Sequence, residues 1–426
     1  MYVMLSPDVN YSSLKEDLSV ISDLKNVRSQ TLNASQNKII TMCTGLNSFD
    51  EIKRCMEGKE KQVGELLSQL HELGYVLFSP VPLDMSEKLH NRCDTSKMTT
   101  HFKPTSLHTV TISILESCCF KCSYCSQSAP LGKGRVMLYE TVIGILKEAY
   151  EMGARYFGVF GGEPMLHPNI YDIIKYASTT GYSDILLFTR ATLIDQHAAK
   201  KLRASGLQRT QVAIDTHIPE EYDNKVGDIG AFSKMLTGMY YLREMNIKSK
   251  IIIVVTKDNI ETVPDTIEYF VTNGFSDVHC EEVAPVGRAG KSISPTKKDI
   301  ENLKRIIEEK RSTDNRYNSV SMAYAQSGKL KSCGGGIGSS MVFADGSVGP
   351  CDRWHDLKKD HSFGNIYDTS FRDIWMSDGA ELFRNIRDYN NCSNCKHLAE
   401  CRGGCVLNAH IENNEFGSDP YCTKKA

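Results

Sequence analysis

Three cysteines on one predicted loop indicate the chemistry of this sequence. Cys118, Cys122 and Cys125 follow the apolar run Val110 to Leu115 with the spacing C-x3-C-x2-C. Thiolates bind zinc and iron-sulfur clusters, but a structural zinc site uses four ligands. Three cysteines on a four-iron cube leave one iron open for a substrate. The loop therefore predicts an iron-sulfur cluster with an open iron, with a structural zinc loop or three buried thiols as the alternatives.

A glycine-rich motif follows the next predicted strand. Gly161, Gly162, Glu163 and Pro164 come directly after the apolar run Tyr156 to Phe160. Paired glycines allow the backbone to approach a ligand closely, although the motif alone would be an ordinary turn. The carboxyl ends of parallel strands meet at one edge of a sheet, which places the motif beside the cysteine loop. That position favours a cofactor site.

Seven more cysteines form a constrained pattern at the end of the chain. A chain with 15 cysteines and no secretion signal does not suggest disulfides, because the cytosol keeps thiols reduced. Metal or cluster ligation is the main explanation, and a pair of zinc ribbons is the alternative. The seven are Cys333, Cys351, Cys392, Cys395, Cys401, Cys405 and Cys422.

The region from His108 to Glu282 supplies the elements that position the first two motifs. Its short apolar runs predict strands at 110–115, 156–160, 185–188, 211–214, 251–255 and 278–283. Helical periodicity between them predicts helices at 139–152, 170–177, 194–204, 232–245 and 260–271. This alternation indicates an α/β fold with six parallel strands in an open, barrel-like sheet.

The cysteine loop and the glycine motif together resemble those of the radical S-adenosylmethionine (SAM) enzymes. The resemblance implies a partial (β/α)6 TIM-like barrel whose 4Fe-4S cluster binds SAM. It also implies that the motif Gly161 to Pro164 contacts the methionine amino group of SAM, and that Tyr124 fills the aromatic position before the last cysteine. In that family reduced SAM yields a 5'-deoxyadenosyl radical, which abstracts hydrogen from an unactivated carbon. No conventional catalytic side chain is expected, and none is identified.

Other strand ends match that family less closely. Thr189 stands where relatives often carry an Asn-Gly pair, and Asp215 stands where many carry Ser-x-Asp. We expect Thr189 to contact the cofactor. Asp215 is a candidate ribose ligand, with capping of its strand as the alternative, and Asn259 is a further candidate.

The cysteine pattern at the end of the chain is similar to the SPASM extension of radical SAM enzymes. That extension houses two auxiliary 4Fe-4S clusters, so the resemblance implies three clusters in all. By position, the first auxiliary cluster would use Cys333, Cys351 and Cys405, and the second Cys392, Cys395, Cys401 and Cys422. Some relatives carry another cysteine between the first two, which is missing here. The first auxiliary cluster therefore has an open iron or a ligand other than cysteine. The motif Pro285 to Ala289 also recurs in such enzymes.

The first 95 residues predict a winged-helix-like module. Strand-like runs at Tyr2–Leu5 and Leu18–Leu24 precede a capping box at Ser48–Glu51, a helical repeat at Glu60–Leu73 and a strand at Tyr75–Phe78. No basic recognition helix accompanies them, which disfavours DNA binding. The pattern resembles the leader-recognition element of enzymes that mature ribosomally made peptides, which binds an extended leader along a strand edge. A stabilising or dimerising domain is the alternative.

Length and charge set the remaining expectations. The 426 residues are enough for two or three cores, and we expect boundaries at 1–95, 106–290, 291–332 for a linker with a bridging helix, and 333–426. The net charge of −2 gives no general basic field for nucleic acid or anionic membranes. The longest run of strong aliphatics, Ile251–Val255, is too short to span a bilayer. The protein is therefore expected in the cytoplasm.

The resemblance implies an enzyme that acts on a precursor peptide. The expected reaction is an intramolecular cross-link, either a Cys thioether or a carbon-carbon bond. Peptide epimerisation and formylglycine formation are alternatives, and the alternative outside enzymes is an iron-sulfur electron-transfer protein that leaves SAM intact. Expected partners are the precursor with its leader and a reductant such as flavodoxin or ferredoxin, without nucleic acid or membrane.

Overall fold

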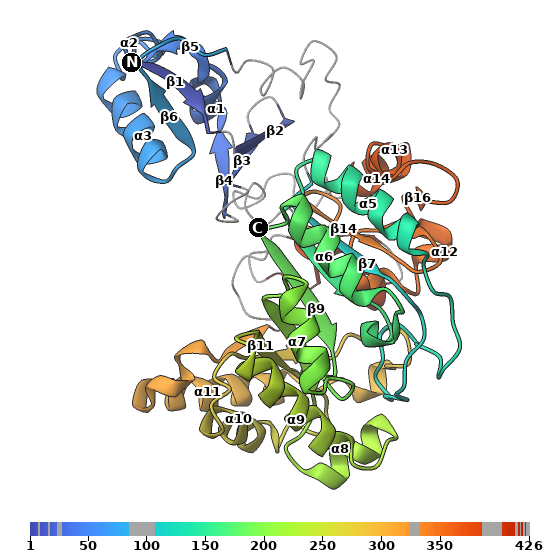
Figure 1. The fold of residues 1–426 in the computed structure, drawn as a ribbon. Coiled ribbons are helices and arrows are strands. Elements are labelled where there is room, and N and C mark those ends of the chain that lie inside the picture. The colour runs from blue at the N-terminus through green and yellow to red at the C-terminus, as the bar shows by residue number, and fades with distance from the viewer. Residues whose placement is uncertain are drawn as a thin grey trace.

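The computed structural model of this chain separates an N-terminal module from a larger α/β body (Figure 1). It describes residues 1–6, 9–15, 18–23, 28–84, 107–323, 333–385, 403–413, 416–417, 419–420 and 422. Cys93 and three of the predicted cluster ligands, Cys392, Cys395 and Cys401, lie outside the described residues.

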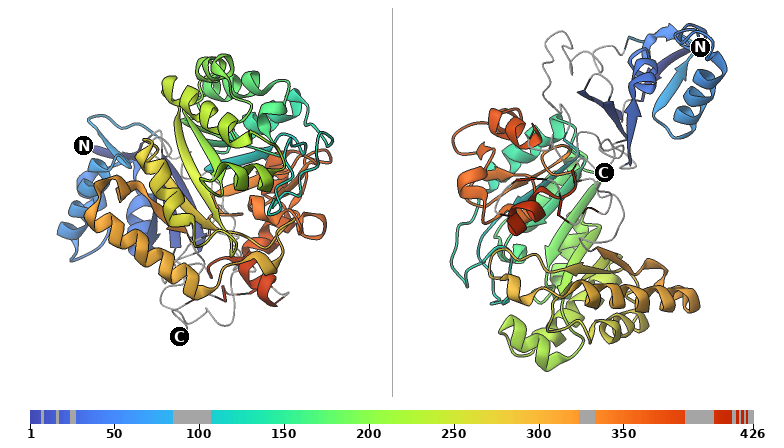
Figure 2. Two further views of the ribbon diagram at one scale, coloured as in Figure 1. Left: turned by 90° about the horizontal axis from the view of Figure 1, so that it is seen from below. Right: turned by 180° about the vertical axis from the view of Figure 1, so that it is seen from behind.

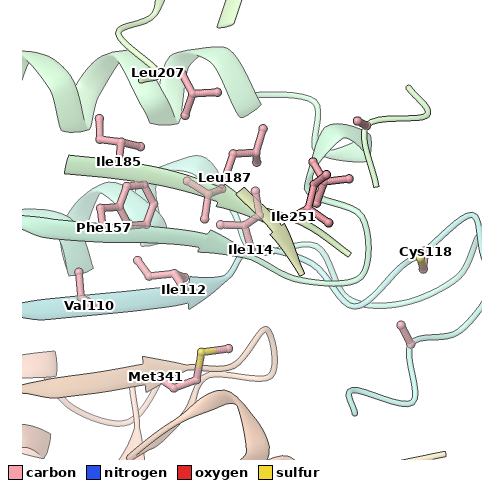
Figure 3. Packing of buried hydrophobic residues seen from close by; sticks show 14 of the residues in the cluster. Val110, Ile112, Ile114, Cys118, Phe157, Ile185, Leu187, Leu207, Ile251 and Met341 are labelled. Atoms are coloured by element: carbon pink, nitrogen blue, oxygen red, sulfur yellow. The ribbon is translucent and has the colours of Figure 1, made fainter. Parts of the chain in front are cut away.

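The α/β body is built on the six parallel strands that the apolar runs predict. They are β7 (Thr109–Ser113), β8 (Tyr156–Phe160), β9 (Asp184–Thr189), β10 (Arg209–Ile214), β11 (Lys248–Val255) and β12 (Val278–Glu282). The strands lie side by side in chain order, and each pairs in parallel with the next. Figure 3 shows side chains of β7, β8 and β9, among them Ile112, Phe157 and Ile185, in one packed layer. The predicted α/β barrel is therefore confirmed.

Amphipathic helices connect these strands. They are α5 (Tyr139–Glu151), α6 (Ile170–Thr180), α7 (Gln196–Ala204), α9 (Ala231–Glu244) and α10 (Val263–Thr272). In α6 the residues Ile170, Ile173, Ile174 and Ala177 recur at three and four and are buried. Gly181 then ends the helix in a left-handed conformation. The five predicted crossovers are confirmed, whereas α8 (Pro219–Val226) was missed because most of its side chains are polar.

The C-terminal region extends the same sheet. β14 (Ser339–Val342) pairs in parallel with β7, and β15 (Ser347–Gly349) and β16 (Gly364–Asn365) continue antiparallel beyond it. At the other edge, β13 (Ser321–Ala323) follows the charged helix α11 (Lys297–Thr313) and pairs with β12. The described strands of the barrel and of the C-terminal region thus form one ten-stranded sheet.

Short helices complete the C-terminal region beside the first barrel strands (Figure 2). They are α12 (Lys358–His361), α13 (Phe371–Trp375), α14 (Asp378–Asn385) and α16 (Val406–Asn413). Buried residues of this region, including Trp354, Trp375 and Phe383, belong to the same hydrophobic core as the barrel. The described part of this region is therefore packed against the barrel.

The N-terminal module has a hydrophobic core of its own. β5 (Thr44–Ser48), β1 (Tyr2–Leu5) and β6 (Val76–Ser79) form one antiparallel sheet, packed by α2 (Phe49–Lys53) and α3 (Glu60–Glu72). The predicted capping box is present, because Ser48 and Glu51 bond each other's backbone N–H groups.

Additional elements stand between the first strand and this helix pair. β2 (Val9–Lys15), β3 (Leu18–Asp23) and β4 (Arg28–Asn33) form a second sheet, and α1 (Ala34–Thr41) follows it. The sequence analysis found only one strand of this sheet. Among the described residues, no helix is long and apolar enough to cross a membrane.

Candidate functional site

A cavity of about 230 Å³ lies at the carboxyl ends of the barrel strands. The cysteine loop, the glycine motif and Thr189 border it, as the sequence analysis expected. Ile252 and Val254 of β11 line another side. Asp352 and Arg353, which directly follow Cys351, also line it. The cavity is therefore the meeting point of the barrel and the cysteine-rich region.

The three barrel cysteines all border this cavity. Figure 3 shows Cys118 on the loop beyond the strand ends. Burial raises the pKa of Cys122, whereas a hydrogen bond with the Cys119 thiol lowers the pKa of Cys118 to about 7. Within the described parts of the chain, no three Cys, His, Asp or Glu side chains are drawn together as in a closed metal site. Three thiols on one cavity wall match the number of protein ligands that a 4Fe-4S cluster with an open iron needs. Their role as cluster ligands stays a prediction.

The paired glycines pack against the cysteine loop. A Cβ on Gly161 would lie 2.6 Å from the Leu115 carbonyl oxygen, and one on Gly162 would lie 2.0 Å from that of Ser117. Backbone hydrogen bonds of 3.0 Å run from Gly162 to Leu115 and from Glu163 to Ser117. Glycine is required at both positions because two backbone segments touch here, which leaves no space for a side chain. The sequence had suggested a different reason, namely the close approach of a ligand to the backbone.

Replacing Gly162 by alanine is expected to weaken the fold by about 3 kcal/mol, since the added methyl group meets backbone that cannot rotate away. Thermal unfolding of the variant measures this cost. Gly144→Ala is the matched control: Gly144 lies in α5 with nothing within 4 Å of its added Cβ, and alanine there favours the helix by about 1 kcal/mol. Equal stability of the two variants would contradict the packing role of Gly162.

Glu163 connects the glycine motif to the end of β9. Its carboxylate accepts hydrogen bonds from the Thr189 hydroxyl at 2.7 Å and from the Arg190 backbone N–H at 3.0 Å. Burial raises the pKa of Glu163, and these donors oppose that rise. Pro164 begins a short 3-10 helix and does not border the cavity. Thr189 therefore contributes to the site by holding Glu163 as well as by lining the cavity.

A buried polar network lies next to the cavity. The Tyr124 hydroxyl donates to Asp215 and accepts from Arg190. The Arg190 guanidinium lies 3.7 Å from the Asp215 carboxylate and donates to the Tyr222 hydroxyl at 3.3 Å. The second Asp215 oxygen is buried and has no hydrogen-bond partner among the residues that the structure describes. Among the described residues, those that line the cavity do not include Asp215, and its role as a ribose ligand stays a prediction.

Arg190 is one of the site residues that were not identified from the sequence. It lines the cavity and contacts the ends of β10 and the cysteine loop as well as its own strand. The sequence feature that could have revealed Arg190 is its position at the end of the strand next to the one that ends at Asp215. Pairing the two residues requires the register of β9 with β10. Asn259, in contrast, bonds the backbone of Asp215, Val254 and Thr256, which is a structural role.

The described C-terminal cysteines also come together. Burial raises the pKa of Cys351, and the neighbouring Cys333 and Cys405 thiols raise it further. Asp419 accepts from the Cys405 backbone N–H at 3.0 Å, while its own carbonyl accepts from the backbone N–H of Cys422. Cys333 and Cys405 are thus near enough to Cys351 to affect its pKa, and their role as one ligand set stays a prediction.

Side chains link this cysteine group to the cavity. Gln127, just after the barrel cysteines, donates to the Asp352 carbonyl at 2.8 Å. Arg353 forms an ion pair with Glu281 at the end of β12. Asp352, Arg353 and Glu281 were not identified from the sequence, because only the fold brings these distant segments together.

Comparisons with known proteins agree with this arrangement. The model of the radical SAM superfamily matches residues 112–270, and that of the SPASM iron-sulfur cluster-binding domain matches residues 333–396. The chain is 28% identical over 337 residues to an AdoMet-dependent heme synthase of Methanosarcina barkeri, covering 72% of this chain and 93% of that protein. It is 24% identical over 322 residues to a PqqA peptide cyclase of Gluconobacter oxydans, covering 72% of this chain and 87% of that protein.

Solved structures show the same fold. SuiB of Streptococcus suis, bound to its precursor peptide SuiA, superposes with a TM-score of 0.71 at 16% identity, covering 99% of this chain and all of SuiB. The enzyme anSMEcpe with bound AdoMet superposes with a TM-score of 0.59 at 23% identity, covering 74% of this chain and 93% of that one. The chain therefore has a radical SAM domain followed by a SPASM domain.

Proposed function

We propose that this radical SAM enzyme modifies a ribosomally synthesised precursor peptide, by forming an intramolecular Cys thioether or carbon-carbon cross-link. The observation that carries the proposal is the cavity bordered both by the barrel cysteines and by the segment that follows Cys351. Cross-linking removes two electrons from the substrate, one with the abstracted hydrogen atom and one from the resulting radical. A barrel cluster with SAM would supply the radical, and an auxiliary cluster held by the C-terminal cysteines would accept the second electron at the same cavity.

The proposed cofactors are SAM and three 4Fe-4S clusters. The barrel cluster would use Cys118, Cys122 and Cys125, and the C-terminal cysteines would hold the two auxiliary clusters. When bound, the barrel cluster and SAM supply the radical that abstracts hydrogen. The residues of the chain position these groups: Glu163 and Thr189 fix the glycine motif, and Arg190 fixes Tyr124 against Asp215.

A peptide substrate is favoured by the N-terminal module. The match to the heme synthase covers 72% of this chain, whereas SuiB, whose structure contains its precursor peptide, covers 99%. The module has its own core and antiparallel sheets whose edge strands offer backbone groups to an extended segment. We propose that residues 1–95 bind the leader and that residues 106–290 form the barrel. Residues 291–332 would then link the barrel to the cysteine-rich region at 333–426. We also propose that the enzyme is cytoplasmic and is reduced by a flavodoxin or ferredoxin.

Mass spectrometry of a candidate precursor tests the proposal. The reconstituted enzyme is incubated anaerobically with SAM, dithionite and a short peptide encoded beside its gene. A cross-link is expected to remove a pair of hydrogen atoms from the peptide as 5'-deoxyadenosine accumulates. Unchanged peptide mass with inverted residues would indicate epimerisation, and an aldehyde would indicate formylglycine formation. Turnover of an iron porphyrin in place of the peptide would overturn the proposal.

A further inference from the structure

The motif Pro285 to Ala289, which follows β12, contacts the cysteine loop directly. The Arg288 side chain donates from Nε to the Cys122 carbonyl at 2.8 Å and from Nη1 to the Ala129 carbonyl at 2.8 Å. Its backbone N–H donates to the Cys125 carbonyl at 2.9 Å. One residue therefore holds carbonyl groups on both sides of Tyr124 and beyond the last barrel cysteine.

The residue before it makes this contact possible. Gly287 has a φ of +65°, and a Cβ there would lie 2.4 Å from the Cys125 carbonyl oxygen. The close approach places the Arg288 backbone N–H within bonding distance of that carbonyl. The Gly287 N–H donates in turn to the Asp356 carboxylate at 2.7 Å. Asp356 belongs to the C-terminal region, so the turn also connects that region to the cysteine loop.

These contacts lie outside the strands and helices of the barrel. Arg288 is an exposed residue at the surface, and its partners are three carbonyls of a loop that lacks regular secondary structure. The side chains of Cys118 and Cys122 on this loop are buried, and β7 and β8 pair with each other through residues outside it. An arginine bonding two carbonyls fixes their relative orientation, because its donors form a rigid planar fork.

We infer that Arg288 is a positioning residue that holds the cysteine loop in the conformation needed for cluster binding, and that Asp356 orients the turn carrying it. The inference rests on the proposed cluster role of the loop. Asp356 gives the C-terminal region a means to influence the barrel site. Asp356 holds Gly287, and Gly287 presents Arg288 to the loop.

Thiol alkylation of the iron-free full-length chain tests the inference without any enzyme activity. Cys122 is 7% exposed, and its alkylation requires the loop to open. In Arg288→Ala the loop loses two side-chain hydrogen bonds, which is expected to accelerate Cys122 alkylation about tenfold. Arg288→Lys keeps one donor group and is expected to give an intermediate rate. Asp356→Ala is expected to give a smaller acceleration, since it acts only through the turn.

Two controls separate loop opening from general loosening. Cys280 is fully buried in β12 and reports opening of the barrel core in the same molecule. Arg311→Ala removes another arginine that bonds a backbone carbonyl, that of Val320, away from the cysteine loop. Both Cys122 and Cys280 are expected to react at the wild-type rate in Arg311→Ala. Acceleration of Cys280 to the same extent as Cys122 in Arg288→Ala would overturn the local role.

A second measurement uses the reconstituted enzyme. The cluster whose electron paramagnetic resonance signal changes on addition of SAM is expected to form in a smaller fraction of Arg288→Ala molecules. Its midpoint potential is expected to become more negative, because a nearby positive charge is removed. Arg288→Lys should retain the wild-type potential. Wild-type alkylation rate and potential in Arg288→Ala would refute the inference, whereas loss of peptide turnover alone would concern only the proposed function.

Discussion

Replacing Cys118, Cys122 and Cys125 together by alanine is expected to abolish SAM cleavage. Iron content should fall from about twelve to about eight atoms per chain, because one of three four-iron clusters is lost. Cys333 and Cys405 interact with Cys351, and the triple variant retains all three, so the auxiliary clusters proposed for the C-terminal region should remain. Liquid chromatography of 5'-deoxyadenosine and iron analysis of the reconstituted variant measure the two effects.

Cys55→Ala is the matched control for the loss of a thiol. Cys55 is partly buried in the N-terminal module, which has a hydrophobic core separate from that of the barrel. Its replacement should leave SAM cleavage and iron content unchanged. Continued formation of 5'-deoxyadenosine by the triple variant would disprove the assignment of the barrel site.

Deleting residues 1–95 is expected to reduce turnover of a full-length precursor to background while uncoupled SAM cleavage continues. The physical reason is the division of buried residues into two clusters: Val3, Ile40 and Leu67 pack within the module, and the barrel has its own core. Removing the module should therefore leave the cavity intact. Peptide mass and 5'-deoxyadenosine, measured in the same reaction, separate the two activities.

The isolated module provides the complementary experiment. A leader peptide labelled with a fluorophore should bind the module, and the same peptide with its sequence scrambled should not. Adding the module back to the truncated enzyme should restore part of the turnover. If the truncated enzyme processed the precursor as fast as the full chain, the module would have a structural function only.

The sequence by itself determined the order and type of the main elements. Apolar runs such as Ile251–Val255 define strands buried on both faces, and the period of Ile170–Ala177 defines a helix with one buried side. These patterns are local, so strands and helices can be predicted from them without knowledge of the fold. Motif spacing predicts the cysteine ligand sets from the same kind of local signal, because a cluster of fixed size restricts the number of residues between its ligands, and those sets stay predictions.

Local sequence patterns failed to predict strands whose side chains are polar and strands whose pairing partners are distant in the sequence. The strands Val9–Lys15 and Arg28–Asn33 are rich in Ser, Asn and Gln, and their pairing rather than their own propensity makes them strands. The C-terminal strand Ser339–Val342 has no periodic pattern, yet it finds its place by adding to the edge of β7.

Only the tertiary structure decided which residues share the site. Arg190 and Asp215 follow the ends of β9 and β10, whereas Tyr124 lies on the cysteine loop, and the contacts between them depend on the register of β9 with β10. The loop contacts of Arg288 bridge more than 150 residues of sequence. Residue types and spacing specify what a segment is able to bind, whereas hydrogen bonds between distant segments require the folded backbone to bring donor and acceptor within about 3 Å.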